Sequence, residues 1–471
     1  MHVLDYLIFG IYMLAVLGIG VFFFTKNKTR EDYYVGGRSI SALHVGLSIA
    51  ATDVGGGFSI GLGGLGYMIG LSGSWLLFTG IVGAWLSAVL IIPKIKRIDQ
   101  KHNLLTFPDF LRLHYDEKVA STAAVISGLG YLGFTGAQIL AGAKLASGTL
   151  FIRPPFGLDP FLFSILIIAV VIILYTVLGG LKAVIFTDTV QWIVLFSGLI
   201  FLAIPFSLVK IGGFGALREA LPGEFFSLTN VSFVQFLNWM VTIVPIWFVA
   251  MTIYQRIYAS RDEKTAKIAW YIGGLFEYPL MAFTGVFLGL CSRVLFSGID
   301  GEMGIPMLIR DVLPVGIAGI VTAAYFSAIM STADSCLMAS SGNVTNDLIR
   351  RFVIKRKGEK GMMLISQVVT LVIGLLALLI AISFTSVLDA ILHAYSFMVS
   401  GLLVPTLGAY FLKTHSSSAA FWSMLTGGAT TIVMKIMGLN LPFGLDQTLA
   451  GILVSAVVFF LVRFLRRKRT L

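Results

Sequence analysis

The sequence predicts an all-α membrane protein with 13 transmembrane helices. Of its 471 residues, 57% are hydrophobic and 12% are charged, whereas about a quarter of the residues of a soluble domain are charged. Apolar runs of roughly 20 residues recur along the whole chain, and each is long enough to cross a hydrocarbon core about 30 Å thick as a helix. The basic residues between these runs gather on alternate connections, as expected for a polytopic protein.

The apolar runs leave no segment long enough for a soluble domain, so we expect residues 1–471 to form one polytopic membrane domain. The first run lacks a basic region before it and a small-residue cleavage site after it, which predicts a retained helix rather than a signal peptide. The predicted helices span residues 3–24, 40–67, 72–93, 118–149, 160–180, 183–208, 233–254, 266–292, 311–347, 362–383, 386–412, 418–438 and 447–465.

The distribution of Lys and Arg predicts the orientation. If Met1 lies outside, 27 of the 34 basic residues fall on inner segments, which include residues 256–267 and the basic tail 463–469, and five fall on outer ones. The positive-inside rule therefore places the amino end outside and the carboxyl end in the cytoplasm, and we expect an inner (plasma) membrane protein. We interpret the basic tail as an anchor to anionic lipid. Because the +11 charge is spread over short loops, no nucleic-acid partner is expected.

The second predicted helix carries Ala-Ala-Thr-Asp-Val-Gly-Gly-Gly at residues 50–57, in the middle of an apolar run. Irregular backbone at membrane depth is tolerated only where it is buried in protein or lines a cavity. The stretch therefore predicts a broken helix, with carbonyl oxygens free for a cation and half-helix ends free for a charged ligand. Close helix packing against small residues is the alternative. Asp53 costs about 2.5 to 3.5 kcal/mol in a membrane helix, which favours a functional role.

The ninth predicted helix carries oxygen atoms along one face. Ala328, Ser331, Thr332 and Ser335 follow the spacing i, i+3, i+4 and i+7, so they lie on one side of a helix. Hydroxyl and carbonyl oxygens suit a small hard cation, and this face is a candidate sodium half-site. Hydrogen bonding between helices explains the same pattern equally well. Asp188 opens the sixth predicted helix, where an N-terminal cap is the alternative to a role in binding.

Five segments, in this order along the chain, resemble the sodium/solute symporter family. The two most specific are residues 50–57 and Ser-Ala-Ile-Met-Ser-Thr-Ala-Asp-Ser at 327–335. The others are Asp-Tyr-Tyr-Val-Gly-Gly-Arg-Ser at 32–39, Leu-Gly-Gly-Leu-Lys-Ala-Val-Ile-Phe-Thr-Asp-Thr-Val-Gln at 178–191, and Gln-Arg-Ile-Tyr-Ala-Ser at 255–260. Together they extend along most of the chain.

The resemblance implies a LeuT-like core of two inverted five-helix repeats, 40–208 and 233–412. One extra amino-terminal helix (3–24) and two carboxyl-terminal helices (418–465) would flank this core. Pro245 lies in the seventh helix at the place that corresponds to the glycine break, and we expect it to interrupt that helix.

The resemblance also implies sodium as the coupling ion. Carried over residue by residue, the main sodium site would use carbonyl oxygens of Ala51, Val54 and Ala328 and hydroxyls of Ser331 and Thr332. A second sodium would involve Asp188 and Ser335, but Asp334 stands where that site usually has a serine. One or two sodium ions per cycle therefore both stay open.

The function implied is import of a small polar organic solute by sodium symport with alternating access. An amino acid such as proline, an organic acid and a quaternary amine are all candidates, because the segment after Thr52 is similar to both the proline and the choline branches. A sugar is the alternative, although residues 72–93 lack the charged group that sugar carriers are expected to place there. The candidate solute-binding residues are Asp53, Gly56, Phe58, Ser59, Ser74, Trp75, Trp247, Thr252 and Tyr395.

Two other classes of function are less consistent with the sequence. An intramembrane enzyme could use Ser331 and Asp334, but the six histidines form no metal pair at helical spacing and no His-Glu-x-x-His motif occurs. A sensor would need a cytoplasmic output domain, and none is expected before Leu471. We therefore expect a transporter and not an enzyme. Its expected partners are solute, sodium and membrane lipid, with no obligate protein partner.

Overall fold

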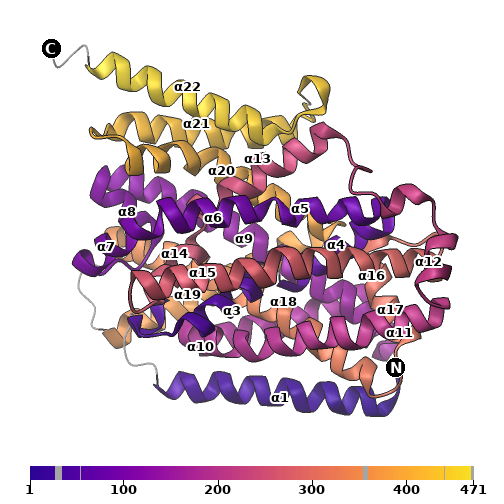
Figure 1. Ribbon diagram of the computed structural model, residues 1–471. Coiled ribbons are helices and arrows are strands. Elements are labelled where there is room, and N and C mark those ends of the chain that lie inside the picture. Colours follow the sequence, from indigo (N-terminus) through magenta and orange to yellow (C-terminus); the bar gives the residue numbers. More distant parts are fainter. Residues whose placement is uncertain (27–33, 54, 354–358, 440, 468–471) are drawn as a thin grey trace.

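The computed structural model describes residues 1–26, 34–53, 55–353, 359–439 and 441–467, which form a bundle of helices lying side by side (Figure 1). No strand occurs in these residues; a single β-bridge joins Ile40 and Ser260. The helices are α1 (Val3–Lys26), α3 (Ala42–Asp53), α4 (Gly55–Ile69), α5 (Trp75–Phe78), α6 (Gly80–Leu90), α7 (Ile92–His102), α8 (Phe107–His114), α9 (Glu117–Gly148), α10 (Pro160–Ser197), α11 (Ile204–Ile211), α12 (Phe214–Ala220), α13 (Phe233–Val249), α14 (Met251–Ala259), α15 (Glu263–Leu275), α16 (Ala282–Leu295), α17 (Gly304–Val312), α18 (Ile317–Gly342), α19 (Glu359–Ser383), α20 (Val387–Phe411), α21 (Ser417–Ile436) and α22 (Gln447–Arg467).

The all-helical membrane class is confirmed. Within the described ranges, nine helices are long and apolar enough to cross a membrane, and the bent pair α13–α14 gives a tenth. Every predicted apolar run coincides with a helix or with consecutive helices. The number 13, the inverted-repeat boundaries and the extra flanking helices stay predictions.

Helix α10 contains the fifth predicted helix and the first part of the sixth, which continues into α11. The Tyr175 hydroxyl donates to Thr187 Oγ1 at 3.0 Å, although these residues are 12 positions apart. A straight helix would separate them by about 18 Å, at a rise of 1.5 Å per residue. The chain therefore bends between them, and residues 160–177 and 184–211 are separate apolar spans, as the prediction of two helices requires.

The predicted break in the second helix is confirmed. Gly55, the first residue of α4, has a φ of +45°, a conformation that lies outside the α-helical range and that side chains with a Cβ rarely adopt, so the helical backbone is interrupted there. Beyond the break, α4 packs closely on α16. A Cβ at Gly66 would lie 2.1 Å from the Val286 carbonyl oxygen, so only glycine allows this approach.

The break in the seventh helix is real, but its predicted position at Pro245 is wrong. Helix α13 continues through Pro245 to Val249, and the 41° bend follows at Ala250. Two tyrosine hydroxyls satisfy the backbone groups that the bend frees: Tyr254 donates to the Phe248 carbonyl at 2.9 Å, and Tyr131 accepts from the Thr252 N–H at 3.2 Å. A backbone group at membrane depth needs such a partner, and the side chains that supply one decide where the helix bends.

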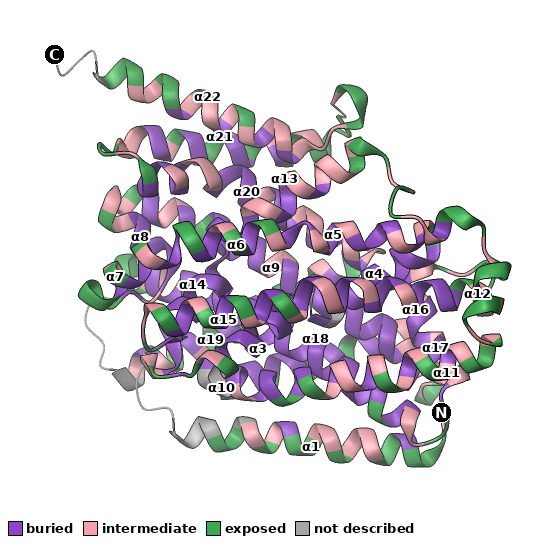
Figure 2. Cartoon of the chain, viewed as in Figure 1, coloured by how far each residue is buried: buried purple, intermediate pink, exposed green. Residues whose placement is uncertain are grey.

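Helices α9 and α18 form the buried centre of the bundle, whereas α1 and α22 lie at its two edges with many exposed residues (Figure 2). Nearly every residue of α18 from Val321 to Gly342 is buried. The oxygen-bearing face of this helix is therefore enclosed by protein and not by lipid, which is the environment that a cation site requires.

Candidate functional site

The two segments predicted to share a sodium ion lie against each other. The Thr332 hydroxyl on α18 lies 3.1 Å from the Ala51 carbonyl oxygen at the end of α3, and 3.1 Å from the Ala328 carbonyl oxygen. A Cβ at Gly55 would lie 1.9 Å from Thr332 Oγ1, so α18 touches the start of α4 as well. Three of the five predicted sodium ligands thus converge at the broken helix. Their oxygens are of the type that sodium prefers.

Ser331, the fourth ligand, also faces this region, where its hydroxyl donates to Asp188 on α10. Ser48 on α3 donates to the other oxygen of the same carboxylate. Asp188 is fully buried, and it ties α3 and α18 together across the site. Val54, the fifth ligand, lies outside the described residues, as does the Asp53 side chain.

A buried cation lies beside these groups. Arg256 on α14 is 1% exposed, and its guanidinium donates to Ser335 at 2.8 Å, to Ser48 at 3.2 Å and to Thr52. The assignment of Arg256 to an inner loop was wrong, because helix α14 extends to Ala259 and turns this side chain into the bundle. The signal was available in the sequence: Arg256 follows an apolar stretch without any preceding turn residue.

The predicted second sodium ligands are not gathered as a set. Ser335 and Asp188 both contact Arg256. Asp334 does not contact Arg256; its Oδ1 accepts from the Thr176 hydroxyl, in the earlier part of α10, at 2.5 Å. The neighbouring positions 334 and 335 are about 100° apart around a helix, so they face different helices. A second sodium site stays a prediction.

An unpredicted side chain, Gln138 on α9, lies at the first turn of α4. Its Oε1 accepts the Gly57 N–H at 3.1 Å, and its Nε2 has no hydrogen-bond partner among the described residues. Gly56, a predicted solute residue, belongs to the same turn of α4. A lone amide in the apolar run 118–149 was the sequence signal for this residue.

Aromatic rings pack beside this turn. Phe58 on α4 lies 6.4 Å from Phe134 and 6.1 Å from Tyr395 between ring centroids, and the latter two are 5.0 Å apart. We call Phe58, Phe134 and Tyr395 the aromatic cluster. Ser59 caps the local backbone by donating to the Gly55 carbonyl at 3.0 Å. Of the predicted solute residues, Phe58, Ser59 and Tyr395 are thus brought together.

The remaining predicted solute residues lie elsewhere. Thr252 hydrogen bonds to Tyr131 on α9 at 3.0 Å, one helical turn from Phe134. Trp247 on α13 packs against Trp270 and Tyr278. Trp75 donates to the Leu228 carbonyl at the end of the bundle, and Ser74 bonds to its own turn at Leu71. Trp75 and Ser74 lie away from the helix break because the third span begins with a short turn that packs on the segment after α12.

The family of this protein is shown by its sequence over most of its length. Residues 33–427 match the model of the sodium:solute symporter family. The chain belongs to this family. It is therefore a transporter and not an enzyme, and sodium is its coupling ion. The match spans both the broken helix and the Ser331–Thr332 face.

Bacterial transporters resemble this symporter over nearly its whole length. The osmoregulated proline transporter OpuE of Bacillus subtilis is 26% identical over 98% of this chain and 94% of its own. The sodium/proline symporter of Escherichia coli is 26% identical over 96% of this chain and 92% of its own. Together with the apolar helices, these relatives indicate a multi-pass membrane protein.

Solved structures show the same fold. An outward-open sodium-coupled sialic acid symporter matches with a TM-score of 0.79 and 20% identity, covering 97% of this chain and 96% of its own. Mhp1, a nucleobase-cation-symport-1 family transporter, matches with a TM-score of 0.60 and 14% identity, covering 93% and 95%. At these identities the likeness shows the LeuT-like fold alone.

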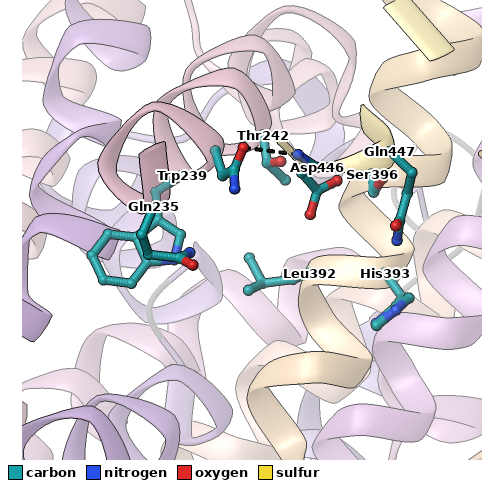
Figure 3. Close-up of a pocket in the computed structure, with 9 residues that line it drawn as sticks. Gln235, Trp239, Thr242, Leu392, His393, Ser396, Asp446 and Gln447 are labelled. Carbon is teal, nitrogen blue, oxygen red and sulfur yellow. Dashed lines mark hydrogen bonds between the residues drawn. The ribbon is translucent and has the colours of Figure 1, made fainter. Parts of the chain in front are cut away.

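Two cavities open at the end of the symporter where α20 begins. The larger has a volume of about 620 Å³ and is lined by Gly61 and Leu388. Gly61 lies one helical turn from Phe58 on α4. The smaller, of about 50 Å³, lies between α13, α20 and the start of α22 (Figure 3). Trp239 and Leu392 line both cavities, so the two are neighbours. The aromatic cluster lies between the larger cavity and Gln138 along α4.

Proposed function

We propose that this symporter imports a small polar organic solute together with sodium by alternating access, with an amino acid of the proline type as the first candidate. The observation that carries the proposal is the approach of Thr332 to the Ala51 and Ala328 carbonyl oxygens at the helix break. Sodium-coupled proline transport by the Escherichia coli relative supports the solute class.

In this proposal sodium enters from the outer end and fills the site between α3 and α18. Carbonyl and hydroxyl oxygens coordinate the ion there, and its binding stabilises the α3–α4 break in the form that accepts solute. Rocking of the broken helices against the rest of the bundle then opens the inner end. A membrane potential adds about 2.3 kcal/mol per sodium charge for each 100 mV.

The proposal includes the predicted orientation, with the amino end outside and the carboxyl end in the cytoplasm, in a bacterial inner membrane. The clustering of basic residues on the connections at one end supports it. The two cavities beside α20 then lie at the outer end, which is the end where solute enters.

Uptake into proteoliposomes, with and without a sodium gradient, tests the function. Thr332→Ala removes the hydroxyl at the site, so we expect the sodium concentration for half-maximal uptake to rise at least tenfold while the amount of protein in the membrane stays similar. Thr322→Ala is the matched control, because Thr322 is equally buried on the same helix but lies away from the break. Sodium dependence that is equal in the two variants would remove this site. Sodium-driven uptake of a sugar but of no amino acid would favour the sugar alternative.

A further inference from the structure

We propose that Gln138 and the amino-terminal turn of α4 bind a carboxylate group of the solute. The inference rests on the proposed function and narrows its substrate class: the solute carries a carboxylate, as an amino acid does, and a sugar or a carboxylate-free quaternary amine is excluded.

A hydrogen bond to α4 fixes the orientation of the Gln138 amide. Its side chain is fully buried, and its Oε1 accepts the Gly57 N–H at 3.1 Å. Because the Gly57 N–H must point at an acceptor, this bond fixes which amide atom is oxygen. The Nε2 atom, with two N–H donors, is then left without a partner among the described residues. A buried donor that stays unsatisfied costs about 1 to 3 kcal/mol, which an acceptor on a bound solute would remove.

The amino-terminal end of α4 also favours an anion. Helix α4 has 15 residues, and the first N–H groups of a helix have no partner within it. The helix dipole places partial positive charge at this end, so an anion is stabilised there. A Cβ at Gly57 would lie 2.5 Å from Gln138 Nε2, so glycine lets the amide lie directly against the turn. Amide donors and helix end therefore face the same place.

The candidate sodium site lies next to this end of α4. The Ala51 carbonyl oxygen, in the last turn of α3, faces Thr332, and Gly55 begins α4 against the same side chain. The negative end of one half-helix thus faces the sodium position, and the positive end of the other faces Gln138. A sodium ion and a carboxylate on either side of one break attract each other. Binding of sodium therefore raises the affinity for a carboxylate solute, which is the coupling that symport needs.

The aromatic cluster supplies the rest of the recognition. Phe134 precedes Gln138 by one helical turn on α9, and it packs on Tyr395 and Phe58. Aromatic faces attract ammonium groups and cover apolar carbon. A solute with its carboxylate at Gln138 would direct its amine and ring toward these side chains. The arrangement fits a small zwitterion.

Thermal unfolding of the purified full-length protein, with sodium or with potassium, tests this inference with solutes paired by shape. The pairs are L-proline with L-prolinamide, glycine betaine with choline, and lactate with lactamide, and glucose is added alone. In wild type we expect one or more of the carboxylate members to stabilise the protein in a sodium-dependent way. We expect no such stabilisation by the amides, by choline or by glucose.

Gln138→Glu keeps the acceptor for Gly57 and the side-chain size but replaces both donors by negative charge. We expect the affinity for the carboxylate solute to fall about 10- to 100-fold, the range expected for a lost hydrogen bond to a charged group, with stabilisation by sodium alone unchanged. Gln191→Glu, at an equally buried glutamine of α10 away from the turn, controls for the added acid. Gln138→Leu removes the amide donors without adding a charge, so it shows the effect of losing the donors alone.

Three outcomes separate the inference from the proposed function. Sodium-dependent stabilisation by choline, an amide or glucose equal to that by the carboxylate member overturns the inference but leaves sodium symport standing. Equal affinities in Gln138→Glu and Gln191→Glu also overturn it. If no solute stabilises the protein in a sodium-dependent way, the proposed function is overturned, and the inference falls with it.

Discussion

The guanidinium of Arg256 lies 3.5 Å from the carboxylate of Asp188, and both side chains are buried at the centre of the bundle. Each residue holds further partners: Asp188 accepts from Ser48 and Ser331, and Arg256 donates to Ser335. The pair therefore connects α14 and α10 with both halves of the sodium site. A charge in such a place is tolerated because its partner and its hydrogen bonds replace water.

Arg256→Gln should destabilise the protein strongly, because it leaves Asp188 as a buried charge without its ion-pair partner. Breaking a buried pair costs about 3 to 5 kcal/mol. Asp188→Asn should cost a similar amount, and the double variant should be less destabilised than the two single effects added together. Thermal unfolding of the four proteins in detergent measures this coupling. Strict additivity would show that the two side chains act independently.

Gly66→Ala should disrupt the packing of α4 on α16, because the new Cβ would lie 2.1 Å from the Val286 carbonyl oxygen. The backbone cannot yield as a side chain would, so we expect a loss of several kcal/mol, in line with severe overpacking. Gly274→Ala is the control, since a Cβ there meets nothing within 4 Å and alanine favours a helix by about 1 kcal/mol. Membrane yield and unfolding temperature should separate the two variants.

Glu302 joins three elements at the end of the bundle where α20 begins. It accepts from Lys144 Nζ at 2.6 Å and from the N–H groups of Val387 and Leu388 at 3.0 and 3.1 Å. Glu302→Gln removes the charge that caps α20 and should cost about 1.5 to 3 kcal/mol. Asp300→Asn should cost less than about 1 kcal/mol, because Asp300 also pairs with Lys144 but is half-exposed. Equal losses of unfolding temperature would contradict this assignment.

His415, in the connection after α20, should make the protein sensitive to mild acid. Burial lowers the pKa of His415, and the neighbouring His114 and Arg463 lower it further. A histidine whose folded pKa lies below its unfolded value of about 6.5 takes up its proton more readily when unfolded, so its contribution to stability is lost as the pH falls through that range. Unfolding temperatures at pH 7.5 and 5.5 should differ less in His415→Gln than in wild type. The exposed His102→Gln should keep the wild-type difference.

The sequence alone determined the membrane class, the positions of the apolar helices and the break before Gly55. These follow from composition and from three consecutive glycines, which are local properties that need no knowledge of neighbours. The oxygen-bearing face of α18 was also predictable, because the helical period alone sets which residues share a face. The chain also specifies, through its five recognisable segments, the symporter family to which it belongs.

Only the tertiary structure decided which polar groups meet across the bundle. It turned Arg256 inward, moved the second bend from Pro245 to Ala250, separated Asp334 from Ser335, and placed Gln138 against Gly57. Each of these depends on partners 79 to 158 residues away, or on the hydroxyl of Tyr131 that receives a freed backbone N–H. In lipid a polar group is stable only where such a partner exists, and the position of that partner is a property of the folded chain.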